Sequence, residues 1–147
     1  MPVPEYAVFE ALDPFFRVVE QGLSGLVDGE HYFDAIANDA LFEFRYNFPG
    51  WPKTVRGRAN LMALYSGYGK TIRLDRGDAL AVHPSKDGNV VTLEYEVHGK
   101  ILATGAPYDN RFISVQNRRE IDAEIRLSRI RFHGGAAQSL SDALLCA

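Results

Sequence analysis

One carboxylate of this chain lies in a segment whose polar and apolar residues alternate as in a β-strand. The other residues on its face of that strand are largely apolar. Asp109 shares a face of residues 100–115 with Ile113 and Val115. An unpaired carboxylate on an apolar face loses its hydration, which is costly. Asp109 is therefore expected to pair with Arg111 two residues on, to face solvent, or to act as an acid in a pocket.

The register of that strand decides between these alternatives. A shift by one residue would turn Tyr108 and Asn110 inward in place of Asp109. Our sequence hypothesis is that Asp109 points into a cavity beside Phe44 and Tyr95. Burial would raise the pKa of its carboxyl above the usual value of about 3.9, and the neutral acid could donate a hydrogen bond to a ligand carbonyl or an oxyanion.

An aromatic stripe precedes a proline-rich turn in residues 41–52, "LFEFRYNFPGWP". Its rings occupy every second position, at Phe42, Phe44, Tyr46 and Phe48. On a strand these rings would share one face. Two interpretations are open: all of the rings are core, or the deeper ones are core and the outer ones form the wall of a cavity.

Tyrosines could add hydrogen bonds to such a cavity, because a buried phenol usually reaches a polar partner. The candidates are Tyr46, Tyr65, Tyr95 and Tyr108. For each of them a purely structural role is the alternative.

Alternation in residues 89–99 puts Glu94, Glu96 and His98 on one face of a strand and apolar side chains on the other. The polar face is expected to meet solvent or a second subunit. The histidines are far apart along the chain, at His31, His83, His98 and His133. None of them forms a helical i, i+4 pair, so no metal site is expected. Phosphate-loop and dinucleotide motifs are also absent, so no cofactor is expected.

Local patterns predict helices first and strands afterwards. Asp13-Pro14 starts one helix, a short helix is expected in residues 30–39, and a third in residues 57–68. From residue 70 onward, period-two alternation predicts four strands with turns that include Gly99. We therefore expect one α+β domain over residues 1–147, with three helices on one face of a curved antiparallel sheet.

Composition sets the protein class. The chain has 147 residues, of which 46% are hydrophobic and 24% charged, with a net charge of −3. These values are typical of a globular protein and argue against a nucleic-acid surface. No apolar run is long enough for a membrane span. The acidic, proline-containing N-terminus and the single cysteine, Cys146, predict a cytoplasmic protein.

This order of elements resembles the nuclear transport factor 2-like superfamily, especially its SnoaL-like and ketosteroid-isomerase-like members. The resemblance covers about residues 10–115 and includes Asn38-Asp39-Ala40 and "VRGR" at residues 55–58. It implies a cone: a strongly curved antiparallel sheet wrapped around three N-terminal helices and open at one end onto an apolar pocket. The expected lining residues are Phe44, Tyr46, Phe48, Trp51, Tyr65, Tyr95, Tyr108 and Asn110, with Trp51 at the mouth.

The catalytic elements of ketosteroid isomerases are only partly matched. Their general base falls on Phe44, and their first-helix tyrosine has no counterpart around Gln21-Gly22. The aspartic acid that they carry in a Pro-x-Asp context is matched by Asp109 in "APYD", residues 106–109. The resemblance therefore implies a pocket without steroid isomerisation, and Asp109 as the one catalytic candidate.

Two classes of function follow. The first is a cofactor-independent enzyme that acts on a small apolar molecule by acid/base chemistry, as an isomerase, cyclase, dehydratase or epoxide hydrolase. The second is a non-catalytic module for a lipophilic ligand or for dimerisation. An enzyme needs an acid or base close to a second polar group inside the pocket, whereas a binding module does not. The open outer face of the sheet favours a homodimer. The role of residues 117–147, which depart from the family pattern, is not predicted.

Overall fold

The structure is a computed structural model that describes residues 4–45 and 52–134. Its helical elements are the 3₁₀ helices η1 (Pro4–Leu12) and η2 (Tyr32–Ala35) and the α-helices α1 (Asp13–Gly22) and α2 (Arg58–Tyr68). Its strands are β1 (Ile36–Phe44), β2 (Thr54–Arg56), β3 (Ile72–Pro84), β4 (Val90–Ile101), β5 (Pro107–Ile121) and β6 (Glu124–Gly134). No helix in these ranges has the length and apolar character needed to cross a membrane.

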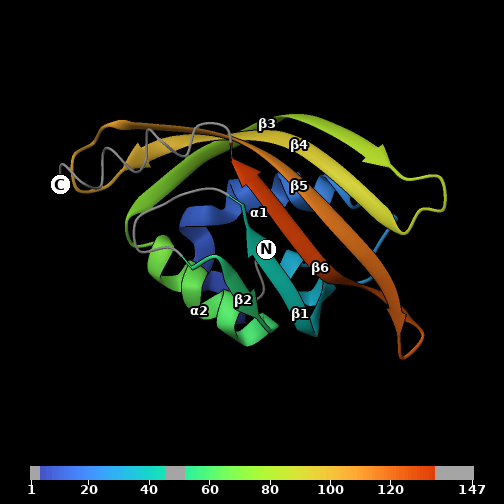
Figure 1. Ribbon diagram of the computed structural model, residues 1–147. Helices are drawn as coiled ribbons and strands as arrows, with labels where there is room; N and C mark the ends of the chain where they lie inside the picture. Colours follow the sequence, from blue (N-terminus) through green and yellow to red (C-terminus); the bar gives the residue numbers. More distant parts are fainter. Residues whose placement is uncertain (1–3, 46–51, 135–147) are drawn as a thin grey trace.

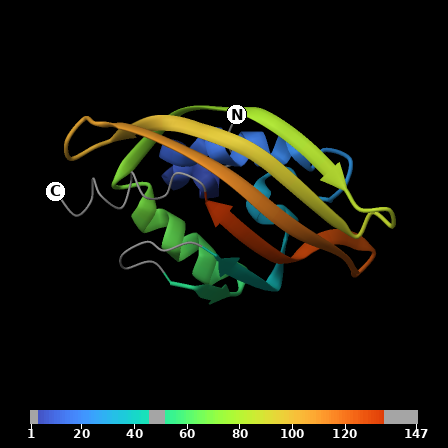
Figure 2. The same cartoon turned by 45° about the horizontal axis from the view of Figure 1, so that its top comes forward.

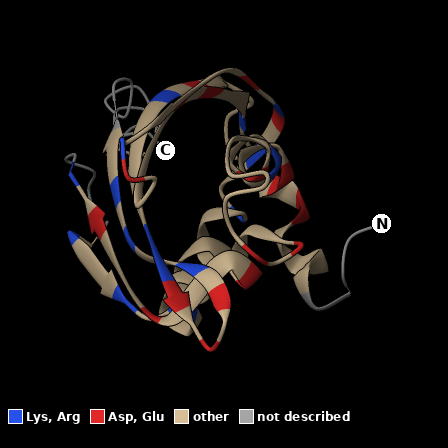
Figure 3. Cartoon of the chain, turned by 90° about the vertical axis from the view of Figure 1, so that its right-hand side faces the viewer, with Lys and Arg blue, Asp and Glu red and all other residues tan. Residues whose placement is uncertain are grey.

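The strands form one six-stranded sheet in the order β2-β1-β6-β5-β4-β3. Neighbouring strands are antiparallel except β1 and β6, which run parallel. The sheet curves around the helices but does not close (Figure 1 and Figure 2). Figure 3 shows the same curvature from the side, with the helices on the concave face. The α+β class and the four strands after residue 70 are thus confirmed.

The expectation of three N-terminal helices is wrong, because the described chain has two α-helices. Residues 32–35 form a single 3₁₀ turn that leads directly into β1 at Ile36. The turn is closed by a capping box in which His31 Nδ1 accepts the Phe33 N–H and Asp34 accepts the His31 N–H. Ile36 then pairs with Leu127 of β6, so residues 36–39, which the sequence pattern assigns to a helix, belong to strand β1 of the sheet.

Packed rings fill the space between α1 and the sheet. Phe15 of α1 lies at their centre, and its ring meets those of Phe16, Tyr32, Tyr65, Tyr95, Phe112 and Phe132 at centroid distances of 5.5–6.4 Å. All of these side chains are buried. Because the rings come from α1, η2, α2 and three strands, this cluster holds the helices against the concave face.

The turn expected at Gly99 is not there; Gly99 lies within β4, opposite Leu74 of β3. A Cβ at this position would lie 2.1 Å from the Arg73 carbonyl oxygen and 2.7 Å from the Leu74 Cα. The neighbouring backbone therefore requires glycine here for close approach rather than for a turn.

We expect Gly99→Ala to lower the free energy of unfolding by at least about 2 kcal/mol, because two paired backbones must separate. Gly67→Ala is the matched control. A Cβ at Gly67, inside α2, meets nothing within 4 Å, so this change should stabilise the protein by about 0.5–1 kcal/mol. Urea unfolding curves measure both effects, and equal midpoints for the two variants would contradict the strand pairing described here.

Glu20 ties the end of α1 to η2, because its carboxylate accepts the Tyr32 N–H at 2.9 Å. Partial burial raises the pKa of Glu20 above its usual value of 4.5, although the Tyr32 hydrogen bond acts in the opposite direction. Between the pKa of Glu20 in the unfolded chain and its raised pKa in the folded chain, the folded chain binds more protons than the unfolded chain. Stability therefore falls as the pH rises through this interval.

We expect Glu20→Gln to be as stable as the wild type below pH 4 and more stable at pH 7, by no more than about 1 kcal/mol because the side chain is only partly buried. Glutamine keeps the acceptor for Tyr32 without the charge. Unfolding midpoints across this pH range give the difference. A difference in unfolding midpoint between the two proteins that does not change with pH would show that the charge on Glu20 does not lower stability.

Candidate functional site

The buried face of β5 carries polar side chains where a sheet core is usually apolar. Its inward-facing residues are Tyr108, Asn110, Phe112, Ser114 and Gln116. Asn110 is 5% exposed, and Ser114 and Gln116 are 0% exposed. Burying amides and hydroxyls is costly unless each finds a partner, so their presence on this face requires an explanation.

Two of these polar residues, Tyr108 and Asn110, meet Tyr68 of α2 at one end of the concave face. The hydroxyls of Tyr68 and Tyr108 lie 2.7 Å apart, and Asn110 Nδ2 donates to the Tyr108 hydroxyl oxygen at 3.0 Å. Tyr68 is the last residue of α2, so the contact joins this helix to β5. Burial raises the pKa of Tyr108, which keeps its phenol protonated at neutral pH. We call Tyr68, Tyr108 and Asn110 the tyrosine–asparagine group.

A second polar group lies further along the same face. Gln116 Nε2 donates to Ser114 Oγ at 3.0 Å. The hydroxyls of Tyr32 and Tyr95 and Gln116 Oε1 are buried without a hydrogen-bond partner in the described part of the chain. Burial raises the pKa of Tyr95, and the nearby Ser114 hydroxyl partly offsets that rise. Unpaired buried atoms of this kind commonly bind ordered water or a ligand.

Packed rings lie on the same concave face as both polar groups. Phe44 stacks on Phe132 with centroids 5.3 Å apart and planes within 7°. Phe112 lies 5.6 Å from Tyr95 and 6.5 Å from Phe132. The concave face therefore combines an apolar wall with hydrogen-bonding groups held in fixed positions, which is the composition of a small-molecule site.

Five of the eight expected lining residues are described by the structure, and three are not. Those found on the buried side are Phe44, Tyr65, Tyr95, Tyr108 and Asn110. The other three, Tyr46, Phe48 and Trp51, lie outside the described residues. The alternative register of the strand, with Tyr108 and Asn110 inward, is the one that the structure has.

The orientation proposed for Asp109 is wrong. Its side chain lies on the outer, convex face, is 66% exposed, and places Oδ1 2.6 Å from His98 Nδ1. The cause is the pairing of Asp109 with His98 and of Asn110 with Val97, which sends every odd-numbered residue of this stretch outward. Arg111 pairs with Glu96 at 3.1 Å rather than with Asp109. The apolar surroundings that the hypothesis required for Asp109 are therefore missing.

The outward direction of the polar side chains of β4 is confirmed, because Leu93, Tyr95 and Val97 are the buried set. His98 lies among three carboxylates on the convex face, those of Asp78, Glu96 and Asp109. The hydrogen bond to Asp109 raises the pKa of His98, and partial burial opposes the rise. Among the residues that the structure describes, one group of side chains could hold a metal ion: Asp78, Glu96 and His98.

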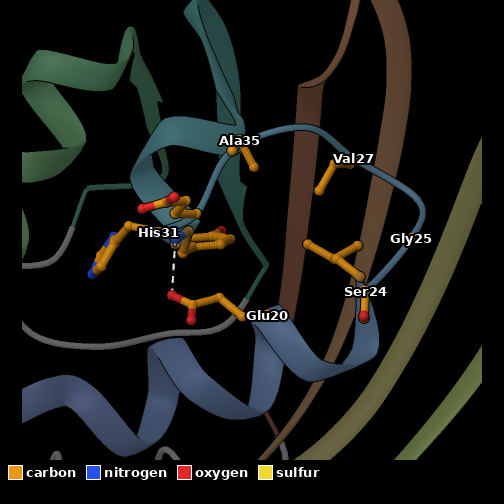
Figure 4. Close-up of a pocket in the computed structure, with 10 residues that line it drawn as sticks. Glu20, Ser24, Gly25, Val27, His31 and Ala35 are labelled. Carbon is orange, nitrogen blue, oxygen red and sulfur yellow. Dashed lines mark hydrogen bonds between the residues drawn. The ribbon is translucent and has the colours of Figure 1, made fainter. Parts of the chain in front are cut away.

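A cavity of about 230 Å³ lies where α1 ends, and sequence reasoning missed it. Figure 4 shows it enclosed by the end of α1, the following loop and η2. Its lining includes Glu20, Ser24, Val27, His31 and Ala35. Burial lowers the pKa of His31, so the ring is neutral and its Nδ1 serves as a cap. The irregular loop that builds this cavity has no periodic pattern, so no sequence signal could have revealed it.

Comparisons with known proteins agree with the fold. No protein-family model matches the chain. Over 82 residues it is 37% identical to the uncharacterized protein YesE of Bacillus subtilis (strain 168), and the match spans 56% of each chain. The chain therefore aligns with little more than half the length of this relative.

Solved structures match over nearly the whole length. A proposed isomerase from Bacillus subtilis is 26% identical, with 96% of each chain covered and a TM-score of 0.68. A proposed polyketide cyclase from Xanthomonas campestris pv. campestris is 16% identical, with 92% of this chain and 94% of that chain covered and a TM-score of 0.61. An NTF2-like protein from Burkholderia xenovorans and a proposed SnoaL-like polyketide cyclase from Mesorhizobium loti share the fold. The chain therefore has the nuclear transport factor 2-like fold, which it shares with these SnoaL-like and ketosteroid-isomerase-like proteins.

Proposed function

We propose that this protein binds a small, largely apolar molecule on the concave face of its sheet and converts it by cofactor-independent acid/base chemistry, as an isomerase or cyclase does. The observation that carries the proposal is the tyrosine–asparagine group, in which Tyr108 and Asn110 are buried and Tyr68 is partly buried, on the same concave face as the packed rings. The rings supply the favourable transfer of an apolar molecule out of water. The phenols supply directional contacts to its polar atom.

The chemistry of the group suits a carbonyl substrate. Asn110 donates to the oxygen of Tyr108, which leaves the Tyr108 proton for the Tyr68 oxygen or for a ligand. A phenol that is already held in place can stabilise the negative charge that develops on oxygen when a proton leaves the neighbouring carbon. Isomerisations and cyclisations of carbonyl compounds both pass through such an enolate.

Structural neighbours support the same reaction class. One of them is described as an isomerase and others as polyketide cyclases. Another, from Catenulispora acidiphila, was crystallised in complex with trimethylamine, so this fold accommodates small molecules.

One observation favours binding without catalysis as the second candidate. The fully buried polar residues of the described chain are Asn110, Ser114 and Gln116, none of which can serve as a general base at neutral pH. The base position of ketosteroid isomerases is occupied by Phe44, which is also buried. A lipophilic ligand carrier needs only the rings and one or two hydrogen-bonding anchors.

Tyr108→Phe tests the proposed site. The naphthalene ketone Prodan serves as the fluorescent probe because its carbonyl accepts a hydrogen bond. We expect the substitution to weaken Prodan binding roughly five- to twentyfold, the usual effect of one lost buried hydrogen bond. Binding of 2-dimethylaminonaphthalene, which has the same rings without the carbonyl, should be unchanged.

Asp109→Asn is the matched control for that experiment, because the side chain lies on the opposite face of the same strand. It should leave the affinity for Prodan unchanged. If Asp109→Asn weakened binding while Tyr108→Phe did not, the site would lie on the convex face and the proposal would fail.

We also propose that the chain forms a homodimer through the convex face. Ile113 is an exposed apolar residue on that face, at 40% exposure. Carboxylates of β4 such as Glu94 and guanidinium groups of β6 such as Arg129 lie on different parts of the same face. A two-fold pairing could therefore match opposite charges around an apolar centre.

Light scattering at micromolar concentration should give twice the chain mass of 16.4 kDa. Ile113→Lys should shift the mass to that of the monomer, because a charge would be buried at the centre of the interface. A wild-type mass of one chain would rule out the dimer.

A further inference from the structure

Three potential metal ligands converge on the convex face, away from the proposed substrate site. They come from adjacent strands: Asp78 from β3, and Glu96 and His98 from β4. His98 Nε2 lies 3.1 Å from Asp78 Oδ1 and 3.5 Å from Glu96 Oε1. One ligand atom of each residue lies within 4.8 Å of the other two.

These separations match the edges of a small coordination sphere. Bonds of about 2.0–2.2 Å from a tetrahedral zinc ion place neighbouring ligand atoms roughly 3.3–3.6 Å apart. Of the two distances from His98 Nε2, 3.5 Å lies within that range and 3.1 Å slightly below it, so a cation could enter between the three atoms after small side-chain rotations. One imidazole with two carboxylates is a ligand set that suits zinc and other first-row divalent cations.

Each ligand is also held from behind by another side chain. Asp109 Oδ1 lies 2.6 Å from His98 Nδ1. Arg76 Nε donates to Asp78 Oδ2 at 3.1 Å. These contacts occupy the atoms that face away from the convergence point and leave His98 Nε2 and Asp78 Oδ1 directed towards it. Metal-binding histidines commonly have such a carboxylate on the other ring nitrogen.

Glu96 is held in the same way, since Arg111 donates to its Oε2 at 3.1 Å and leaves Oε1 near His98. The local charge then favours a cation. Three carboxylates, of Asp78, Glu96 and Asp109, stand against the two guanidinium groups of Arg76 and Arg111, which leaves one net negative charge when the imidazole is neutral.

We propose that this convex face binds a divalent transition-metal cation such as zinc through His98 Nε2, Asp78 Oδ1 and Glu96 Oε1, with Asp109 as the positioning residue for the imidazole. The cation takes the place of the proton on Nε2, which passes to solvent. Because Asp78 and Glu96 are 45% and 28% exposed, the remaining coordination positions face water. The bound ion would join β3 to β4, and the site does not depend on the proposed function.

The histidines lack the helical i, i+4 spacing of a metal site, which is why none is expected from the sequence. These ligands instead lie two residues apart on one strand, at Glu96 and His98, and across the neighbouring strand at Asp78. The pairing of Asp78 with Glu96 brings the third ligand in, and this pairing follows a register irregularity in β3 that no sequence pattern marks.

Zinc titration of the full, untagged chain by calorimetry, after removal of metals with EDTA, tests the proposal. We expect one zinc ion per chain. His98→Ala should weaken its binding at least a hundredfold, and Asp109→Asn should weaken it roughly 10–100-fold, as is usual for loss of an outer carboxylate. His83→Ala is the matched control: His83 lies on the same two-strand face but contacts a single carboxylate, Glu94, at 2.7 Å, and the affinity should not change.

Circular dichroism shows whether the variants remain folded. If His98→Ala does not fold, Asp78→Asn decides, because it changes only one atom of a half-exposed side chain and should also weaken zinc binding strongly. The proposal is overturned if the wild-type chain takes up no zinc at millimolar concentration, or if a folded His98→Ala or Asp78→Asn protein binds zinc as the wild type does.

Discussion

The alternation of β5 between its neighbours is the constraint on which both faces of this protein depend. Pairing with β4 along residues 107–117 fixes which side chains of β5 lie on the concave face and which lie on the convex face. Tyr108 and Asn110 are turned towards the rings, and Asp109, between them, is turned towards His98. A slip of one residue would exchange the two sets, placing a carboxylate among the rings and an amide in the charged cluster.

The two faces use opposite physical chemistry. On the concave side, the rings around Phe15 exclude water, so each hydroxyl or amide left there is strongly directional and must be paired by the chain, by water or by a ligand. On the convex side, solvent weakens each ion pair, and only the convergence of several charges around His98 makes the cluster distinctive. The sheet separates these sites, so a change on one face should leave the other intact.

Much of the fold could be predicted from sequence because alternation in the last four strands is regular, as the outward Glu94 and inward Leu93 illustrate. The site could be predicted only in part. Tyr108 and Asn110 were candidates, but local alternation fits either register, and the choice depends on pairing with β4. The turn at Tyr32–Ala35 was mistaken for a helix because its apolar spacing suits both structures until β6 pairs with Ile36.

The central claim is that a ligand binds against the tyrosine–asparagine group. The side-chain amide of Asn110 gives a direct readout, because its two Nδ2 protons are visible by NMR and one of them is hydrogen-bonded to Tyr108. Titration of the labelled protein with Prodan should shift the Asn110 side-chain signals in proportion to the probe bound and leave the backbone amides of the outer β3 residues in place. Saturating binding that leaves the Asn110 side-chain signals unmoved would contradict the account.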